Sequence, residues 1–147
     1  MNLLKIKRLG SSPGFQTPNY MTEGASGMDL CAALDAPVLL QPQGRALIPC
    51  GFSMEVPEGY EAQIRPRSGL AIRHGITCLN SPGTIDHDYR GEIKIILVNH
   101  GQEAFEIKAG ERIAQMVIAK VERLKIELVM DISETSRGGG GFGSTGK

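Results

Sequence analysis

The segment Asn80–Glu92 contains the side chains best suited to chemistry on a small substrate. It begins with an amide that offers both a donor and an acceptor, as recognition of a nucleobase edge requires. After a Pro-Gly turn it carries two carboxylates, Asp86 and Asp88, which we expect to point to opposite faces and therefore not to share a metal or a proton. One of them can act as a general base facing a pocket, while the other pairs with a cation such as Arg90. A hairpin with a solvated acidic loop is the alternative interpretation, and this segment alone leaves both open.

A basic residue and a hydroxyl stand together in the segment Arg65-Pro-Arg-Ser-Gly-Leu-Ala71, where a short helix is expected to begin. Free N–H groups and the helix dipole attract anions to such a terminus, and the forked guanidinium of Arg67 adds donors for phosphate oxygens. Gly69 would allow the backbone to approach a ligand closely. The alternative is a capped surface helix with an incidental arginine; the pattern favours anion binding.

Two further polar residues lie in apolar surroundings. Asp29 is the carboxylate of the segment Ala25-Ser-Gly-Met-Asp-Leu-Cys31, and Gln115 is an amide within the apolar run Ile113–Ile118. A buried amide needs hydrogen-bond partners, from the protein or from a ligand. Taken alone, Asp29 is better interpreted as a turn aspartate and Gln115 as a satisfied core amide.

The C-terminal segment differs in composition from the rest of the chain. Six of the ten residues 137–146 are glycine, with Arg137, Ser144, Thr145 and the single aromatic Phe142 among them. Such a backbone can wrap phosphates through N–H and hydroxyl donors, although the pattern is not that of a Walker A loop. A plain flexible tail is the usual alternative, and Phe142 argues against it because a linker has no need of an aromatic ring. We expect the tail to be mobile without a ligand.

These segments must be positioned by an all-β framework with one short helix. A helix is expected over Ser68–Gly75, with Ser68 as N-cap and Gly75 as left-handed terminator. The run Ile93–Asn99 is apolar at both alternating sets of positions, as in a strand buried on both faces. Short runs separated by glycine and proline predict a sandwich or barrel, with strands over Leu3–Leu9, Val38–Leu40, Arg45–Pro49, Phe52–Val56, Glu61–Arg65, Ile93–Asn99, Phe105–Ile107 and Ile113–Leu128.

Length and composition predict one compact domain, over residues 1–132, followed by a flexible glycine-rich arm over residues 133–147. Sixteen basic residues balance sixteen acidic ones, so a nucleic-acid polymer is not the expected ligand. The three cysteines form neither a C-x-x-C pair nor an even set, which favours a reducing compartment over a disulfide framework. With neither a signal peptide nor an apolar run that could span a bilayer, the chain is predicted to be cytoplasmic.

Taken together, the five segments resemble the five motifs of the trimeric dUTPase family, in the same order. The strings ASGMDL, RPRSGLA, GTIDHDYRGE, GERIAQM and RGGGGFGSTG span residues 25–146, nearly the whole chain. The resemblance implies a distorted jelly-roll, barrel-like subunit of the β-clip type and a homotrimer with active sites shared at its interfaces. It also implies Mg²⁺-dependent hydrolysis of dUTP to dUMP and pyrophosphate, which lowers dUTP and supplies dUMP for thymidylate synthesis.

The resemblance assigns roles to individual residues. Asp86 would be the general base that activates water for attack on the α-phosphorus. Asp29 would orient water bound to Mg²⁺, which itself is held mainly by the triphosphate. Tyr89 would pack on the deoxyribose and exclude a 2′-hydroxyl. The uracil would be held by Asn80, Gly83, Thr84 and Ile85 and covered by Phe142, with a further substrate contact from Lys94. The phosphates would be held by Arg67, Ser68, Gly69 and Gln115, and the γ-phosphate by Arg137, Ser144 and Thr145.

Two alternative functions remain. A dCTP deaminase-related enzyme also has a strand that ends in asparagine, with a catalytic glutamate three residues before it. Here the strand ends at Asn99 and the corresponding position is Ile96, which cannot transfer protons. The second alternative is a non-catalytic sensor that binds dUTP and signals to a partner protein. The presence of both Asp86 and the glycine-rich arm argues against it.

Overall fold

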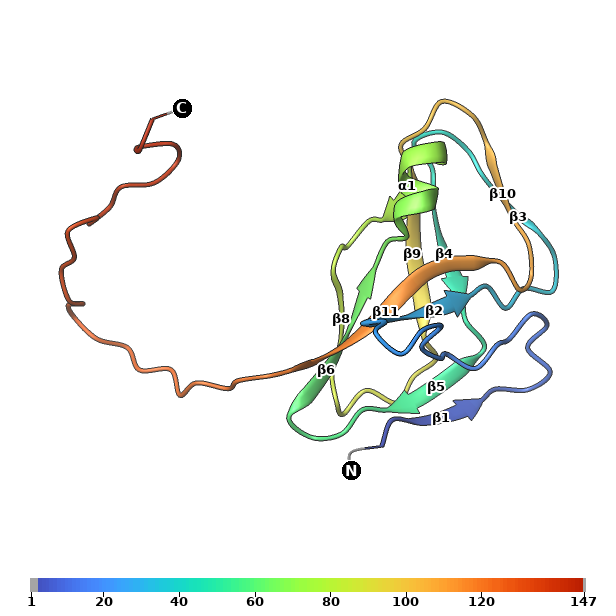
Figure 1. The fold of residues 1–147 in the computed structure, drawn as a ribbon, viewed down its shortest axis with the longest axis horizontal. Coiled ribbons are helices and arrows are strands. Elements are labelled where there is room, and N and C mark those ends of the chain that lie inside the picture. The colour runs from blue at the N-terminus through green and yellow to red at the C-terminus, as the bar shows by residue number, and fades with distance from the viewer. Residues whose placement is uncertain (1–2, 147) are drawn as a thin grey trace.

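The protein is an all-β barrel with one short helix (Figure 1). The computed structural model describes residues 3–146, so the ends of the two predicted units, residues 1–2 and 147, lie outside the described residues. The elements are β1 (Lys5–Arg8), β2 (Gly27–Cys31), β3 (Val38–Leu40), β4 (Arg45–Pro49), β5 (Phe52–Glu55), β6 (Tyr60–Arg65), α1 (Ser68–His74), β7 (Ile76–Cys78), β8 (Gly83–Ile85), β9 (Lys94–Asn99), β10 (Phe105–Ile107) and β11 (Arg112–Lys120).

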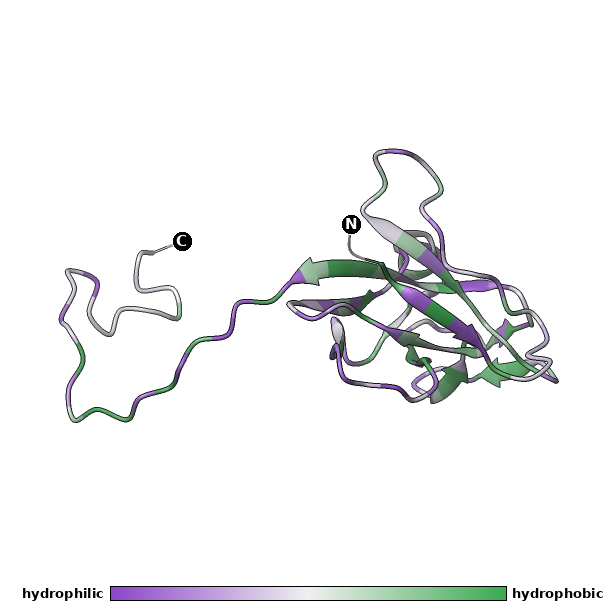
Figure 2. Cartoon of the chain, turned by 90° about the horizontal axis from the view of Figure 1, so that it is seen from below, coloured by the Kyte–Doolittle hydropathy of each residue, from purple (hydrophilic) through white to green (hydrophobic). Residues whose placement is uncertain are grey.

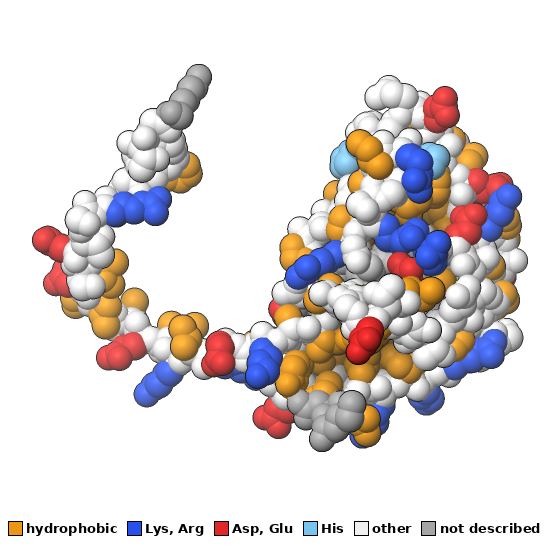
Figure 3. Space-filling model, in the orientation of Figure 1, with side chains coloured by type: hydrophobic (Ala, Val, Ile, Leu, Met, Phe, Trp, Pro, Cys, Tyr) orange, Lys and Arg blue, Asp and Glu red, His pale blue; other side chains and the backbone are white. Residues whose placement is uncertain are grey.

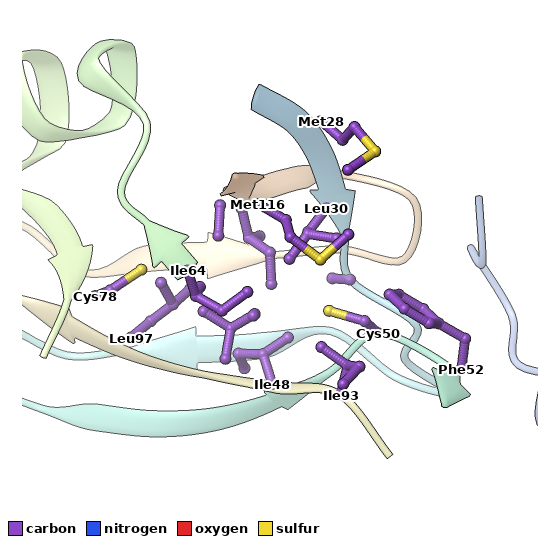
Figure 4. Close-up of a cluster of buried hydrophobic side chains, with 14 of the residues drawn as sticks. Met28, Leu30, Ile48, Cys50, Phe52, Ile64, Cys78, Ile93, Leu97 and Met116 are labelled. Carbon is purple, nitrogen blue, oxygen red and sulfur yellow. The ribbon is translucent and has the colours of Figure 1, made fainter. Parts of the chain in front are cut away.

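Four antiparallel sheets enclose one core. The largest sheet has the order β2-β11-β6-β8 and the second β4-β9-β7, while β1 pairs with β5 and β3 pairs with β10. Side chains from both large sheets meet at the centre, where Ile48, Leu97 and Met116 are completely buried and Phe52 and Ile93 nearly so (Figure 4). The predicted fold class is therefore confirmed.

Strand β9 is buried on both faces for most of its length, as the sequence predicts. Ile95, Leu97 and Val98 are buried, and Ile96 is partly buried. The strand ends at Asn99, whose buried amide donates to the carbonyl oxygens of Leu40 at 2.9 Å and Glu103 at 2.8 Å. Because its side-chain oxygen also accepts from the Gly101 amide, the whole group is satisfied by backbone, and Asn99 is a structural residue.

Three strands were not predicted from the sequence: β2, β7 and β8. Each is short and contains glycine, threonine or aspartate, and each is held by pairing with a long central strand: β2 with β11, β7 with β9 and β8 with β6. Their extended conformation therefore depends on partners distant in sequence.

The predicted strand over Ile113–Leu128 is wrong at its C-terminal end. Strand β11 ends at Lys120, which pairs with Tyr60, the first residue of β6. After one further bond, from the Val121 amide to the Gly59 carbonyl at 3.0 Å, the chain leaves the barrel. Figure 1 shows this segment extending away from the barrel, and Figure 2 shows apolar and polar residues alternating along its first part.

The helix forms over the predicted residues, but its cap differs. Arg67, with extended backbone at φ −92° and ψ 128°, is the N-cap, so Ser68 is the first helical residue and not the cap. No side-chain hydrogen bond caps this end. Gly75 terminates the helix in the left-handed conformation at φ 68°, as predicted. Within residues 3–146, no helix is long and apolar enough to cross a membrane.

Candidate active site

The central strand β11 brings three of the five segments together. Gln115 pairs with Asp29 of β2 on one side and with Arg65 of β6 on the other. Arg65 is followed by Pro66 and Arg67, the N-cap of α1. The register of one sheet therefore places the carboxylate, the arginine and the amide, which are far apart in sequence, at neighbouring positions.

Asp29 is clamped by two arginines. Arg67 donates from Nε to Oδ1 of Asp29 at 3.1 Å, and Arg112 donates from Nη1 to Oδ2 at 3.2 Å. Arg67 also donates from Nη1 to the carbonyl oxygen of Arg112 at 3.2 Å, which closes the network. The Asp29 and Arg67 side chains are mostly buried, with 21% and 26% exposed. Figure 3 shows basic side chains gathered around an acidic one below α1.

The amide of Gln115 has a hydrogen-bond partner within the protein. It donates from Nε2 to the Pro66 carbonyl oxygen at 2.9 Å. Its oxygen lies over Gly27, where an added Cβ would come within 2.6 Å of it, so a side chain at position 27 would push the amide aside. The Gln115 amide thus holds the chain directly before Arg67.

A second cluster lies at the C-terminal end of β8, around a cavity of about 290 Å³. Asp86, Tyr89 and Lys94 line it together, with Thr84 and Ile85 from β8. Leu47, Ile93 and Ile96 add apolar walls. The cavity thus joins a carboxylate, a phenol and an ammonium on an apolar surface, as a pocket for a small polar molecule requires.

Tyr89 is held in place by the residues that follow it. Its hydroxyl donates to the Glu92 carbonyl oxygen at 3.1 Å, and its ring covers Gly91, where a Cβ would lie only 2.3 Å from the hydroxyl oxygen. The Glu92 carboxylate pairs with Lys94 at 3.5 Å. Glu92 therefore fixes both a ring and a cation on the wall of the cavity.

Asp86 and Asp88 were expected to point to opposite faces of an extended chain, but an extended chain places residues two apart on the same face. The chain instead turns, because the Tyr89 amide donates to the Asp86 carbonyl oxygen at 3.2 Å, and Asp86 lines the cavity whereas Asp88 does not. Arg90 donates to the carbonyl oxygens of His87 and Tyr89, and no ion pair joins it to Asp88 in the described chain.

Asn80 packs against Gly83. The Asn80 amide nitrogen lies 3.2 Å from where a Cβ on Gly83 would stand, and the Cβ of Ile64 lies 3.3 Å from the same point. Gly83 is buried and pairs with Ile64. A side chain at position 83 would have to displace one of these neighbours.

The two clusters are separated within one chain. Ile85, directly before Asp86, pairs with Ala62, three positions along β6 from Arg65, which is level with Gln115. At about 3.3 Å per residue and about 4.8 Å per strand spacing, the Cα atoms of Ile85 and Gln115 are about 14 Å apart. The arm residues form a third group away from the barrel, and Phe142 is completely exposed (Figure 1).

Comparison with known proteins identifies the family. A family model described as dUTPase matches residues 14–146. The chain belongs to the dUTPase family.

Individual relatives cover nearly the whole chain. It is 59% identical to the deoxyuridine 5′-triphosphate nucleotidohydrolase of Rhizobium etli (strain CIAT 652), covering 97% of this chain and 93% of that protein. It is 53% identical to the protein of that name from Anaeromyxobacter sp. (strain Fw109-5), covering 98% and 97%. Among solved structures, the Staphylococcus bacteriophage 80alpha dUTPase with dUPNHPP superposes over 100% of both chains with a TM-score of 0.88 at 26% identity.

Sequence reasoning missed two residues of the candidate site. Arg112 joins Asp29 and Arg67, although it reads only as a charge before an apolar strand. Glu92 holds Lys94 and Tyr89, although it reads only as the end of an acidic loop. The available signal was position, since both lie inside segments already singled out for other residues.

Proposed function

We propose that the protein hydrolyses dUTP to dUMP and pyrophosphate by in-line attack of water on the α-phosphorus. The observation that carries this proposal is the cavity that joins Asp86, Tyr89 and Lys94 on apolar walls. Family membership and relatives named for this activity support it. The size of the cavity, about 290 Å³, suits the nucleoside part of a nucleotide better than a polymer.

In this proposal the cavity holds the nucleoside, and Asp86 on its wall acts as the general base. Asp86 is exposed at its wall and accepts the proton of the attacking water. Tyr89 meets the deoxyribose, and its fixed ring leaves no room for a 2′-hydroxyl. Asn80 and the backbone of residues 83–85 bind the uracil edge, and Lys94 makes a further substrate contact.

The Asp29 network forms the phosphate-binding half. Arg67 binds phosphate oxygens with the N–H groups that Asp29 and Arg112 leave free, next to Ser68, Gly69 and Gln115. The arm, proposed to start at residue 133, closes over the site. Its phosphate ligands and uracil cover would be Arg137, Phe142, Ser144 and Thr145.

Magnesium fits this arrangement as an ion carried by the substrate. Among residues 3–146 there is no group of three or more His, Cys, Asp or Glu side chains that could hold a metal ion. Both oxygens of Asp29 already accept hydrogen bonds, so Asp29 suits a contact through water better than direct coordination. Bound Mg²⁺ would neutralise phosphate charge. A structure of a phage phi11 dUTPase, 22% identical, is described as showing a structural Mg(II) ion.

The separation of the two halves supports a homotrimer with shared sites. A water activated by Asp86 must attack a phosphorus atom held by Arg67, yet the Cα atoms of Ile85, directly before Asp86, and of Gln115, beside the Arg67 network, are about 14 Å apart. A second copy could bring its phosphate-binding half to the cavity. The extended segment between β11 and the arm supports the same conclusion, because Leu124, Ile126 and Leu128 alternate along it and are 85%, 95% and 100% exposed.

A nucleotide panel tests the proposed function. Purified protein is given dUTP, dTTP, dCTP or UTP with and without Mg²⁺, and pyrophosphate and ammonia are measured. We expect Mg²⁺-dependent pyrophosphate from dUTP alone. Ammonia from dCTP would favour a deaminase, and tight dUTP binding without any product would favour a sensor.

A binding role beside catalysis is the second candidate function. The 80alpha dUTPase structure is described as belonging to phage dUTPases that control transfer of virulence genes.

For location we propose the cytoplasm, because all three cysteines, Cys31, Cys50 and Cys78, are free.

A further inference from the structure

We propose that Arg112 is a positioning residue for phosphate binding, which holds Asp29 and Arg67 so that the free edge of the Arg67 guanidinium faces the phosphates. This inference rests on the proposed function. Arg112 contacts Asp29 through its side chain, and its backbone carbonyl oxygen accepts a hydrogen bond from Arg67.

The network leaves one part of Arg67 free. Its Nε is bonded to Asp29 at 3.1 Å and its Nη1 to the Arg112 carbonyl at 3.2 Å. Neither bond uses Nη2, whose two N–H groups remain available for an anion. Two fixed points on a planar group determine the direction of the third, so Asp29 and Arg112 together set where Nη2 points.

Arg112 also fixes Asp29. A carboxylate held at one oxygen can rotate about its side-chain bonds, and the bond from Arg112 Nη1 to Oδ2 at 3.2 Å removes that freedom. The Arg112 side chain is 53% exposed, whereas that of Asp29 is 21% exposed. Arg112 therefore closes the solvent side of a pair that is otherwise mostly buried.

A bulge in β11 turns Arg112 toward this network. Gln115 pairs with Asp29 and Ala114 with Leu30, but Arg112, and not Ile113, pairs with Cys31. In a regular strand, alternation would put Arg112 on the face of Ala114 and Met116, both of which are completely buried. The extra residue moves Arg112 to the Asp29 face. Bulges that redirect a side chain in this way are frequent next to active sites.

A double-mutant cycle tests the inference. Arg112→Gln, Asp29→Asn and the double variant are compared with Arg45→Gln, an exposed arginine on β4. The measurements are the melting temperature, kcat and KM for dUTP, and the Kd values of an α,β-imido analogue of dUTP and of dUMP. We expect Arg112→Gln to weaken analogue binding about tenfold, with dUMP binding and kcat changed less than about threefold.

The cycle separates positioning from direct contact. If Arg112 acts through Asp29, the substitution has little further effect in the Asp29→Asn background. Additive losses, equal losses for dUMP and the analogue, or no loss at all would overturn the inference. If Arg112→Gln does not fold, Arg112→Lys is used instead, with a smaller loss that must again vanish beside Asp29→Asn. Failure of the wild-type protein to release pyrophosphate from dUTP would refute the proposed function, while inorganic triphosphate binding would still test the network.

Discussion

One prediction concerns Ile126, in the extended segment between β11 and the glycine-rich arm. Its side chain is 95% exposed and so adds almost no buried apolar surface to the barrel of its own chain. If this segment packs on another copy, burying the side chain contributes about 2 kcal/mol per subunit, and therefore about 6 kcal/mol per trimer. Replacing Ile126 with Asn should remove that contribution and raise the concentration needed for trimer assembly about a hundredfold, because this concentration scales with the square root of the monomer–trimer equilibrium constant.

Sedimentation velocity over a range of protein concentrations measures the effect. Glu127→Gln is the matched control, because it changes the neighbouring residue, which points to the other side of an extended chain. We expect the control to remain a trimer at concentrations where Ile126→Asn dissociates and loses dUTP hydrolysis in parallel. A variant that remains trimeric and active at every concentration would show that the apolar side of this segment does not hold the subunits together.

Four further predictions test the site and the chain around it. Asp86→Asn should keep binding of a dUTP analogue and lose about 10²- to 10⁴-fold in kcat, and activity within a few-fold of wild type would exclude Asp86 as the base. Tyr89→Ala should reduce the ratio of dUTP to UTP hydrolysis, and an unchanged ratio would place sugar discrimination elsewhere. A chain ending at Ser136 should keep its melting temperature and dUMP affinity but lose dUTP turnover, whereas early unfolding would refute a separate arm. Burial raises the pKa of Cys50 to about 12 and of Cys78 to about 11, so neither thiol should react with a thiol reagent in the native protein at neutral pH; labelling should rise only on unfolding, and rapid native labelling would contradict this.

Local patterns predicted the strands that carry their own signal. Val38–Leu40, Arg45–Pro49 and Phe105–Ile107 form with the predicted ends, because turn residues stop them on both sides. Strands β2 and β8 were missed because their extended form comes from pairing with β11 and β6. The excess length predicted for β11 has the same origin, since alternation continues to Leu128 but the partner strand does not.

The site was predictable as a set of segments but not as an arrangement. Motif strings pointed to Asp29, Arg67 and Gln115, and the sheet register brings them together. Nothing in the string GERIAQM shows that a bulge turns Arg112 to the side of Asp29, because residue alternation assigns it to the buried face. Pairing geometry decides that orientation, and it depends on both strands at once.

Charge counting explains why the proposed site needs parts from outside the barrel. A nucleoside triphosphate carries about four negative charges at neutral pH, because the terminal phosphate has a second pKa near 6. Arg67 and Arg112 together outweigh Asp29 by one charge, Lys94 is already balanced by Glu92, and Asp86 adds one negative charge at the cavity. The barrel residues of the proposed site thus supply no net positive charge, and about four negative charges of the triphosphate stay uncompensated. Magnesium would offset two of them and Arg137 of the arm a third. Removing either the metal or the arm should therefore spare nucleoside recognition and strongly slow the attack on phosphorus.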